Sequence, residues 1–251
     1  MNDLDRFLKA KDLAGAKFAE DGIGTYSEKM LHRTLKFYFE PDSKNHEIEF
    51  LGSVADIKNS EEIVEIQTRS FNKLVPKLEK FLPVEKVRVI YPIIEHKLIC
   101  RIDEKTGESL PPTKSTKRGR AWNALPELAQ IAEFIPHHNL SVTLVFLDVT
   151  ETRLLNGKIK VGSKKTSKID VIPTALNSTV DLIELKDFLL LLPPQIPSEF
   201  TSADFEKITK LHGIQLHNSL IFLVKIGILT REKRGGRAYI YSVDPDISSA
   251  T

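Results

Sequence analysis

The stretch HEIEFLGSVADIKNSEEIVEIQT, residues 46–68, contains three short segments rich in Val, Ile and Phe. These segments cover residues 46–51, 54–57 and 63–68, and the pairs Gly52-Ser53 and Asn59-Ser60 lie between them. Short β-branched and aromatic runs bounded by Gly, Asn and Ser are typical of strands joined by tight turns. The stretch therefore predicts a three-strand meander.

Helical patterns flank the predicted meander on both sides. Ser27 is a suitable N-cap for a helix that runs to about residue 39, in which apolar residues recur at helical spacing. A second helix is predicted over 72–81, and the nearly all-apolar segment 87–92 predicts a buried strand. The expected order is helix, three strands, helix, strand.

Prolines divide the chain into three predicted units. Pro111-Pro112 and Pro193-Pro194 separate residues 1–112, 113–197 and 198–251, because proline fixes φ and removes a hydrogen-bond donor. The middle unit is predicted to be a connecting α/β region with a basic linker, a helix at 124–134, a strand at 141–148 and a helix at 179–192. Its role is undefined by the sequence.

The C-terminal unit has the pattern of two helices followed by a hairpin. Thr201 or Ser202 caps the first helix, residues 215–226 form the second, and strands at 228–231 and 238–243 flank the Gly235-Gly236 turn. The unit resembles a winged helix-turn-helix domain, a resemblance that implies DNA binding through the second helix and the hairpin.

Two carboxylates of the meander are placed to act together. Asp56 ends the second segment and Glu65 lies in the third, so a hairpin between them brings the two side chains toward each other. Glu65 and Gln67 are two residues apart and share one face of the strand. Converging carboxylates supply the hard oxygen ligands that Mg²⁺ prefers. Glu28, at the start of the first helix, adds a third carboxylate, and His32 follows one turn later.

At these residues the chain resembles the PD-(D/E)XK nuclease superfamily, over residues 22–95 or so. The resemblance implies a restriction-endonuclease-like αβββαβ core within an α/β (α+β) fold. It also implies that Asp56 and Glu65 are the metal-binding acids, that Gln67 stands where the family usually has Lys, and that Glu28 is the helix Glu of the resolvase-like branches. The wider sequence resembles an uncharacterised bacterial family of predicted nucleases.

The Gln at position 67 departs from the family pattern. Gln67 carries no charge to stabilise a phosphorane, although an amide orients a water molecule through hydrogen bonds. Lys36, Lys58 and Arg69 are nearby cations that could supply the missing positive charge. Without one of them, the alternative is a catalytically idle nuclease fold that serves as a DNA-binding or regulatory protein.

Basic residues cluster in the second half of the chain. Residues 1–113 carry a net charge of −2 and residues 114–251 a net charge of +4. Separated basic clusters are the electrostatic signature of a polyanion-binding protein. The residues predicted to contact nucleic acid are those of the linker (Lys114, Lys117, Arg118, Arg120), the second helix of the C-terminal unit (Gln215, His217, Asn218) and its hairpin (Arg231, Lys233, Arg234, Arg237).

Composition excludes several classes of protein. A single Cys rules out an internal disulfide and a Cys-rich zinc site, and no run of residues suits a secretory signal or a membrane span. No Gly-rich phosphate loop occurs, so no nucleotide cofactor is expected. The sequence thus predicts a cytoplasmic DNA endonuclease that uses Mg²⁺ or Mn²⁺ and has no membrane partner. RNA as the substrate and assembly as a homodimer stay open alternatives.

Overall fold

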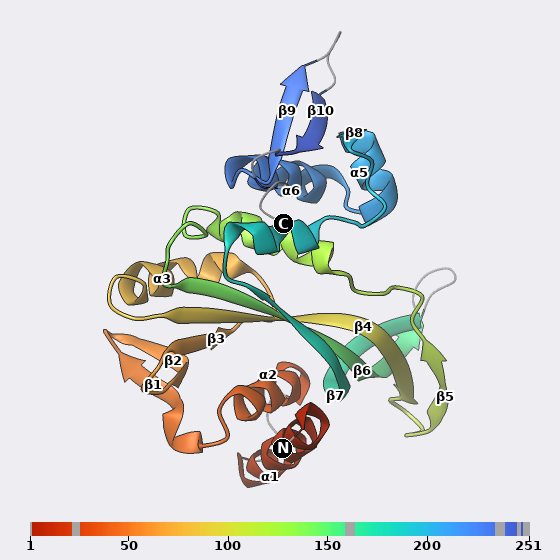
Figure 1. The fold of residues 1–251 in the computed structure, drawn as a ribbon. Coiled ribbons are helices and arrows are strands. Elements are labelled where there is room, and N and C mark those ends of the chain that lie inside the picture. Colours follow the sequence, from red (N-terminus) through yellow and green to blue (C-terminus); the bar gives the residue numbers. More distant parts are fainter. Residues whose placement is uncertain (1, 22–25, 159–163, 234–238, 245–246, 248–251) are drawn as a thin grey trace.

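The computed structural model describes residues 2–21, 26–158, 164–233, 239–244 and 247, with no side chain described at 17–29 or 156–165. The chain is a mixed α+β protein (Figure 1). Its helices are α1 (Asp3–Asp21), α2 (Tyr26–Phe39), α3 (Val75–Phe81), α4 (Leu125–Leu128), α5 (Ser202–Thr209) and α6 (Gly213–Lys225). The 3-10 turns are η1 (Ser43–Asn45), η2 (Phe71–Lys73), η3 (Ala121–Ala124), η4 (Ala129–Ile131) and η5 (Leu185–Leu191).

A seven-stranded mixed sheet forms the centre of the protein. Its strands are β1 (His46–Phe50), β2 (Ser53–Lys58), β3 (Ile63–Ile66), β4 (Val87–Asp103), β5 (Ser109–Lys114), β6 (Leu140–Lys158) and β7 (Lys164–Leu182). The order is β1-β2-β3-β4-β6-β7, and β5 pairs with the second half of β4. Strand β4 is parallel to both β3 and β6, whereas the other pairs are antiparallel.

Each face of the sheet buries its own core. Helices α1 and α2 cover one face, where Phe7 and Leu35 pack against Ile66 and Val145. Helix α3, the short turns η3 to η5 and the C-terminal unit cover the other face (Figure 1). Alternation along β3 serves both cores, since Val64 and Ile66 belong to the first and Ile63 to the second.

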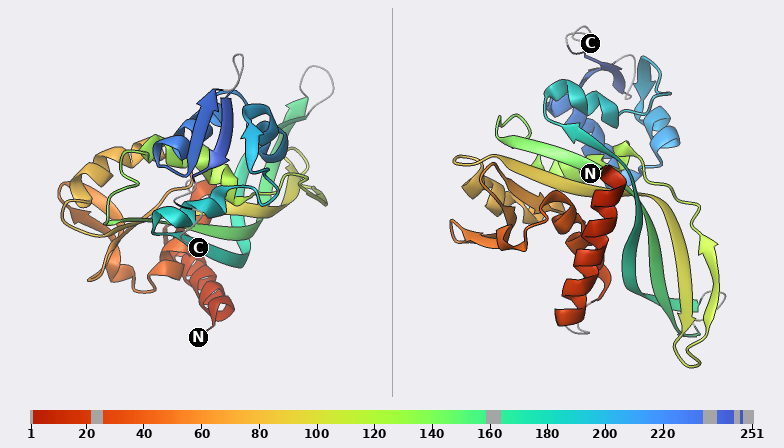
Figure 2. Two further views of the ribbon diagram at one scale, coloured as in Figure 1. Left: turned by 45° about the horizontal axis from the view of Figure 1, so that its top comes forward. Right: turned by 60° about the horizontal axis from the view of Figure 1, so that its bottom comes forward.

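The predicted meander and its flanking helices agree with the elements found, apart from their bounds. The middle region differs from the prediction. The expected strand at 141–148 is part of β6, which forms a long hairpin with β7, and β4, β5, β6 and β7 extend beyond the helices as an arm (Figure 2). The helix expected at 179–192 is wrong, because β7 continues to Leu182 and a 3-10 turn follows. The helix expected at 124–134 is three short turns.

The predicted boundary at residue 112 does not separate two sheets. Strand β4 lies before it and β6 after it, yet they pair in parallel over 16 register positions from Val87↔Leu140 to Asp103↔Leu155. The first two predicted units therefore share one sheet and both of its cores.

The C-terminal unit contains α5, α6 and a separate three-stranded sheet. Strands β8 (Glu199–Thr201), β10 (Tyr239–Val243) and β9 (Leu229–Lys233) pair antiparallel in the order β8-β10-β9. Thr201 caps α5, as predicted, by accepting a hydrogen bond from the Asp204 N–H. Phe188 of η5 packs against Phe222 of α6, so the unit continues the core of the main sheet. No helix in the described part of the chain is both long and apolar enough to cross a membrane.

Candidate active site

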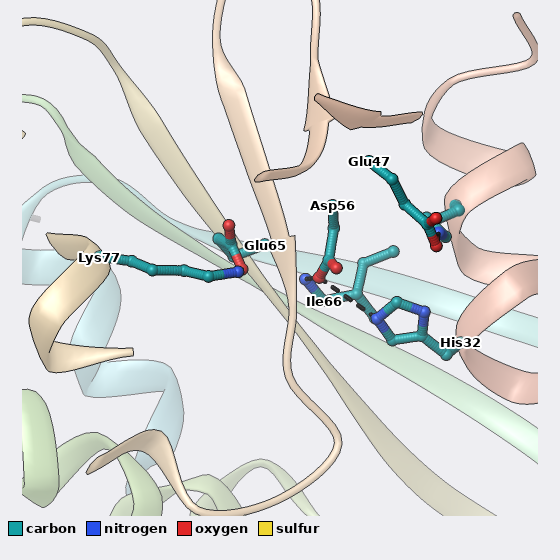
Figure 3. A network of polar contacts seen from close by, with 7 residues as sticks. His32, Glu47, Asp56, Glu65, Ile66 and Lys77 are labelled. Carbon is teal, nitrogen blue, oxygen red and sulfur yellow. Dashed lines mark hydrogen bonds and ion pairs between the residues drawn. The ribbon is translucent and has the colours of Figure 1, made fainter. Parts of the chain in front are cut away.

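The site begins where strands β2 and β3 stop pairing. Their paired register covers Ile57↔Val64 and Lys58↔Ile63, so Asp56 is the first residue of β2 beyond it. The Asp56 carboxylate Oδ2 accepts a hydrogen bond from the Ile66 N–H at 2.8 Å. A side chain thus takes the place of a ladder bond and fixes Asp56 against β3 (Figure 3).

The point where β2 and β3 separate is called the strand fork. Glu65 lies on β3 next to this fork and points toward α3 (Figure 3). Its side chain is 2% exposed, and its Oε2 accepts a hydrogen bond from Lys77 Nζ at 2.7 Å. Its other oxygen, Oε1, is buried and has no hydrogen-bond partner among the described residues. A buried, unsatisfied carboxylate oxygen is costly for the fold and is open for a ligand.

Burial and charge act on the two carboxylates differently. Burial, together with the negative charge of Asp56, raises the pKa of Glu65 to about 7, even though Lys77 opposes the shift. Burial also disfavours ionised Asp56. There, however, the hydrogen bonds from His32 and Ile66 and the charge of Lys77 prevail and hold its pKa below the usual value. The pair therefore consists of one firmly ionised carboxylate and one that titrates near neutral pH.

Helix α2 contributes His32 to the site. The His32 Nε2 lies 3.2 Å from Asp56 Oδ2. Since α2 and α3 cover opposite faces of the sheet, Asp56 is held from one face and Glu65 from the other (Figure 3). The site therefore lies where β2 and β3 separate, and residues from both faces of the sheet contribute to it.

The raised pKa of Glu65 predicts a pH-dependent stability in metal-free protein. A carboxyl group whose folded pKa lies above its unfolded value favours folding when protonated, so its contribution falls as pH rises from about 4.5 to about 7. We expect Glu65→Gln to gain roughly 2–3 kcal/mol relative to wild type between pH 5 and pH 8. Urea unfolding in EDTA measures it, and a pH-independent difference between the two proteins would contradict the assignment.

A cavity of about 900 Å³ surrounds these groups. Elements α2, β2, β3, η2 and α3 all contribute to its wall. Basic side chains predominate among the charged groups of the lining, which are Arg33, Lys36, Lys73 and Lys77, with His32 and His46, against Glu47, Asp56 and Glu65. Two converging acids within a basic cavity suit a cation and an anionic substrate together.

The other predicted catalytic residues lie as follows. Glu28 is in the first turn of α2, but its side chain falls outside the described part. Gln67 lines the cavity, and its Nε2 donates to the Ser70 carbonyl at 2.9 Å. Of the substitute cations, Lys58 pairs with Glu85 at 3.0 Å and is not part of the cavity lining.

The predicted basic linker runs along the edge of β4. Ser115 N–H donates to the Lys97 carbonyl and Gly119 N–H to the Ile94 carbonyl, each at 2.8 Å. At Gly119 a Cβ atom would lie 2.4 Å from Ile94 O, so only glycine allows this approach. Gln67 at the end of β3 bonds Ile90 on the same edge. The linker therefore approaches the site most closely at Ile94, four residues beyond Ile90 and about 13 Å further along β4.

The linker cations Lys114, Lys117, Arg118 and Arg120 are all exposed. In the C-terminal unit, Gln215, His217 and Asn218 are exposed on α6, and Arg231 and Lys233 are exposed on β9. Arg234 and Arg237 lie outside the described residues. The structure thus leaves every described member of the predicted nucleic-acid surface accessible to solvent, with the linker along the edge of β4 and the C-terminal unit on the α3 face of the sheet (Figure 1).

Sequence reasoning missed two members of the site, Lys77 and Glu47. Lys77 lies one position before Leu78 of the buried helix face, and only the packing of α3 on β3 brings it to Glu65. Glu47 binds Lys36 across the cavity. Across the residues with described placement, no three His, Cys, Asp or Glu side chains converge into a metal-binding group. The protein itself therefore offers the two carboxylates of Asp56 and Glu65.

Comparison with known proteins gives family matches without a function. Residues 29–183 match a family described as "Domain of unknown function (DUF8091)". An "Uncharacterized protein" of Treponema pallidum (strain Nichols) is 28% identical over 224 residues, which cover 89% of this chain and 88% of that protein. No solved structure matches the chain. The matched range contains the whole cavity lining that begins at His32 and ends at Lys77.

Proposed function

Because the chain belongs to the DUF8091 family, a domain family of unknown function, we propose its activity from the site itself: it is a metal-dependent DNA endonuclease. One observation carries the proposal. Asp56 and Glu65 line one basic cavity at a strand fork, near enough for the charge of Asp56 to act on Glu65, and Lys77 Nζ lies 2.7 Å from Glu65 Oε2. Paired acids and a cation at one point are the groups that phosphodiester hydrolysis requires.

The order of elements supports a PD-(D/E)XK-like core. Helix α2, the meander β1 to β3, helix α3 and the start of β4 follow one another in the αβββαβ order that this resemblance implies. The two acids lie on β2 and β3, where the family places them. Lys77, from the following helix, then takes the part of the cation that Gln67 lacks.

The carboxylates fit a magnesium ion. Mg²⁺ keeps several waters and commonly binds one or two carboxylates together with substrate phosphate oxygens. The unsatisfied Oε1 of Glu65 and the ionised carboxylate of Asp56 supply two such ligands. When bound, the ion would polarise the scissile phosphate and lower the pKa of water. Manganese, which prefers the same ligands, would substitute.

The chain's own residues perform the remaining tasks. His32 Nε2 and the Ile66 N–H both contact Oδ2 of Asp56 and so hold the carboxylate in its orientation. The Lys77 ammonium stabilises negative charge that develops on the phosphate. Gln67 is engaged with Ser70 and shapes the loop that follows β3. In this proposal, the positive charge of Lys77 replaces the positive charge of the lysine in the family motif.

The exposed basic linker and a winged-helix C-terminal unit hold the DNA. Two helices and a three-stranded sheet are the elements of a winged helix, with α6 as the recognition helix and β9 and β10 as the wing. Lys and Arg on these elements suit phosphate contacts, which contribute affinity and position. Their placement on one edge and one face supports binding of a long polyanion.

A specific observation favours a second candidate, the catalytically idle DNA-binding protein. Asp56 already accepts bonds from His32 and Ile66, and Glu65 accepts one from Lys77, so both acids have partners before any metal arrives. A scaffold stabilised by these contacts would bind DNA in the same way with and without divalent ions.

The test is cleavage of labelled single-stranded, duplex and branched DNA by the full chain with Mg²⁺, Mn²⁺ or EDTA. We expect products with either metal and none in EDTA, and the preferred substrate identifies the DNA shape. Sequence-specific binding without cleavage under any metal would overturn the nuclease and select the idle protein. Cleavage of labelled RNA in place of DNA would overturn the assignment of the polymer.

A further inference from the structure

The cavity contains a second charged pair that the proposed chemistry does not use. Lys36 Nζ donates to Glu47 Oε1 at 2.7 Å. The Lys36 side chain is 7% exposed, whereas the Glu47 side chain is 71% exposed. The pair thus joins a buried cation, which water cannot hydrate fully, to an anion that loses little on moving into solvent.

The backbone of Glu47 is held in an unusual conformation. Its φ is 53°, in the left-handed region that non-glycine residues rarely adopt. Such strain persists only where the surroundings impose it, and it concentrates at ligand-binding and switching positions. Here the neighbouring register pairs His46↔Ile57 and Ile48↔Ala55 place Glu47 opposite Asp56 in the β1–β2 ladder. The strained residue therefore lies beside the metal-binding acid.

The charges around Glu47 favour its ionised carboxylate next to Lys36. The hydrogen bond and the positive charge of Lys36 hold the pKa of Glu47 below its usual value, while burial and the charge of Asp56 oppose that shift. Glu47 is thus attracted by Lys36 and repelled by Asp56. Its carboxylate occupies the position in which an anionic ligand would contact Lys36 and lie near Asp56.

We propose that Lys36 is a phosphate subsite of the cavity, occupied by Glu47 until an incoming phosphodiester displaces it. The identity of the ligand as a DNA phosphodiester rests on the proposed function; the anion subsite itself rests on the Lys36–Glu47 geometry. On displacement, the Glu47 carboxylate moves into water and the Lys36 ammonium donates to a phosphate oxygen. A buried ammonium requires an anionic partner in both states, so one anion replaces the other.

The exchange also changes the charge of the cavity. With Glu47 in place, four Lys or Arg side chains face three carboxylates, and after its departure they face two. Figure 3 shows Glu47 on the same side of the strand fork as His32 and Asp56, so a phosphate that replaced its carboxylate would lie near these two residues. Glu47 accordingly acts as a competitor that keeps weak anions out and yields to a polyanion that the linker also holds.

The test measures anion binding without turnover. A 5′-phosphorylated thymidine dinucleotide and, separately, inorganic phosphate are titrated calorimetrically into the full chain in EDTA. Glu47→Gln keeps the size of the side chain and removes the competing charge, so both probes should bind about tenfold more tightly than to wild type. Lys36→Met should bind them about tenfold more weakly, and thermal unfolding confirms that this variant is folded.

Glu85→Gln is the matched control, because it removes the carboxylate partner of Lys58 at 3.0 Å outside the cavity lining. Its affinity should equal that of wild type. Equal affinities in wild type and Glu47→Gln for both probes would overturn the subsite. A gain with inorganic phosphate alone would overturn the phosphodiester as its ligand. Since EDTA prevents cleavage, a protein that shows the expected binding but never cuts DNA with Mg²⁺ loses the nuclease assignment and keeps the subsite.

Discussion

Asp56→Asn is expected to lower the DNA cleavage rate by about a thousandfold or more while leaving DNA affinity within a few fold of wild type. Asparagine has nearly the same shape, and its oxygen still accepts the Ile66 N–H bond, so the fork between β2 and β3 persists. It lacks the negative charge that a divalent cation needs from its ligand. Rates on end-labelled duplex in Mg²⁺, and affinities measured in EDTA, separate the two effects.

The chain offers a close control for this substitution. Asp148 on β6 also pairs with a histidine, His96, at 2.8 Å, but it lies outside the cavity lining. Asp148→Asn should cleave DNA at the wild-type rate. A wild-type rate in Asp56→Asn would contradict a metal-binding role for Asp56, and an equal loss in both variants would show that the effect is not specific to the cavity.

Local sequence pattern was sufficient for the part of the fold around the site. The strands near 46–66 and the helices α2 and α3 are short elements whose apolar spacing and turn residues lie within a few positions of each other. Their mutual order could therefore be predicted before the structure was known. The same is true of the C-terminal helices, where Thr201 caps α5 and Gly227, with φ of 81°, ends α6.

The arm could not be predicted because its stability is not local. Strand β7 pairs with β6 in a register that shifts several times, and Thr174 and Asn177 of β7 are passed over at two of these shifts. Glu151 of β6 is a charged residue that is only 2% exposed. Its burial is possible because Lys97 and Arg153 form ion pairs with it. Read alone, residues 179–192 have the apolar content of a helix. Pairing of Leu182 with Val142 makes the first of them a strand.

The same distinction applies to the site. Asp56 and Glu65 are connected by one hairpin, so their approach follows from strand periodicity. Lys77 is brought to Glu65 by the packing of a helix on a sheet, and the Lys36–Glu47 pair depends on one left-handed backbone residue. Neither contact has a sequence signature. The position of the family's motif lysine could therefore be located in the sequence, whereas Lys77, the residue that we propose in its place, could not.

Lys77→Met is expected to reduce the cleavage rate by about a hundredfold or more, chiefly in kcat, because the removed ammonium acts on charge that develops in the transition state. The metal-free fold should survive, since Glu65 can bind a proton when its cation is removed, and a bound metal ion would displace that proton. Single-turnover rates on the preferred DNA, with protein in excess, measure the chemical step directly. Lys77→Arg keeps the charge and should retain more activity than Lys77→Met.

Lys80→Met is the control on the same helix, because Lys80 donates to Ser53 Oγ at 2.9 Å and does not line the cavity.

A double variant tests whether a lysine at position 67 can replace Lys77. If Lys77 performs the task of the motif lysine, adding Gln67→Lys to Lys77→Met should restore part of the lost rate, since position 67 also lines the cavity. A wild-type rate in Lys77→Met would remove Lys77 from the mechanism. If Lys77→Met loses activity and Gln67→Lys restores none of it, the role of Lys77 would be limited to holding Glu65 in place. A positive charge at the family position would then not stabilise the phosphate.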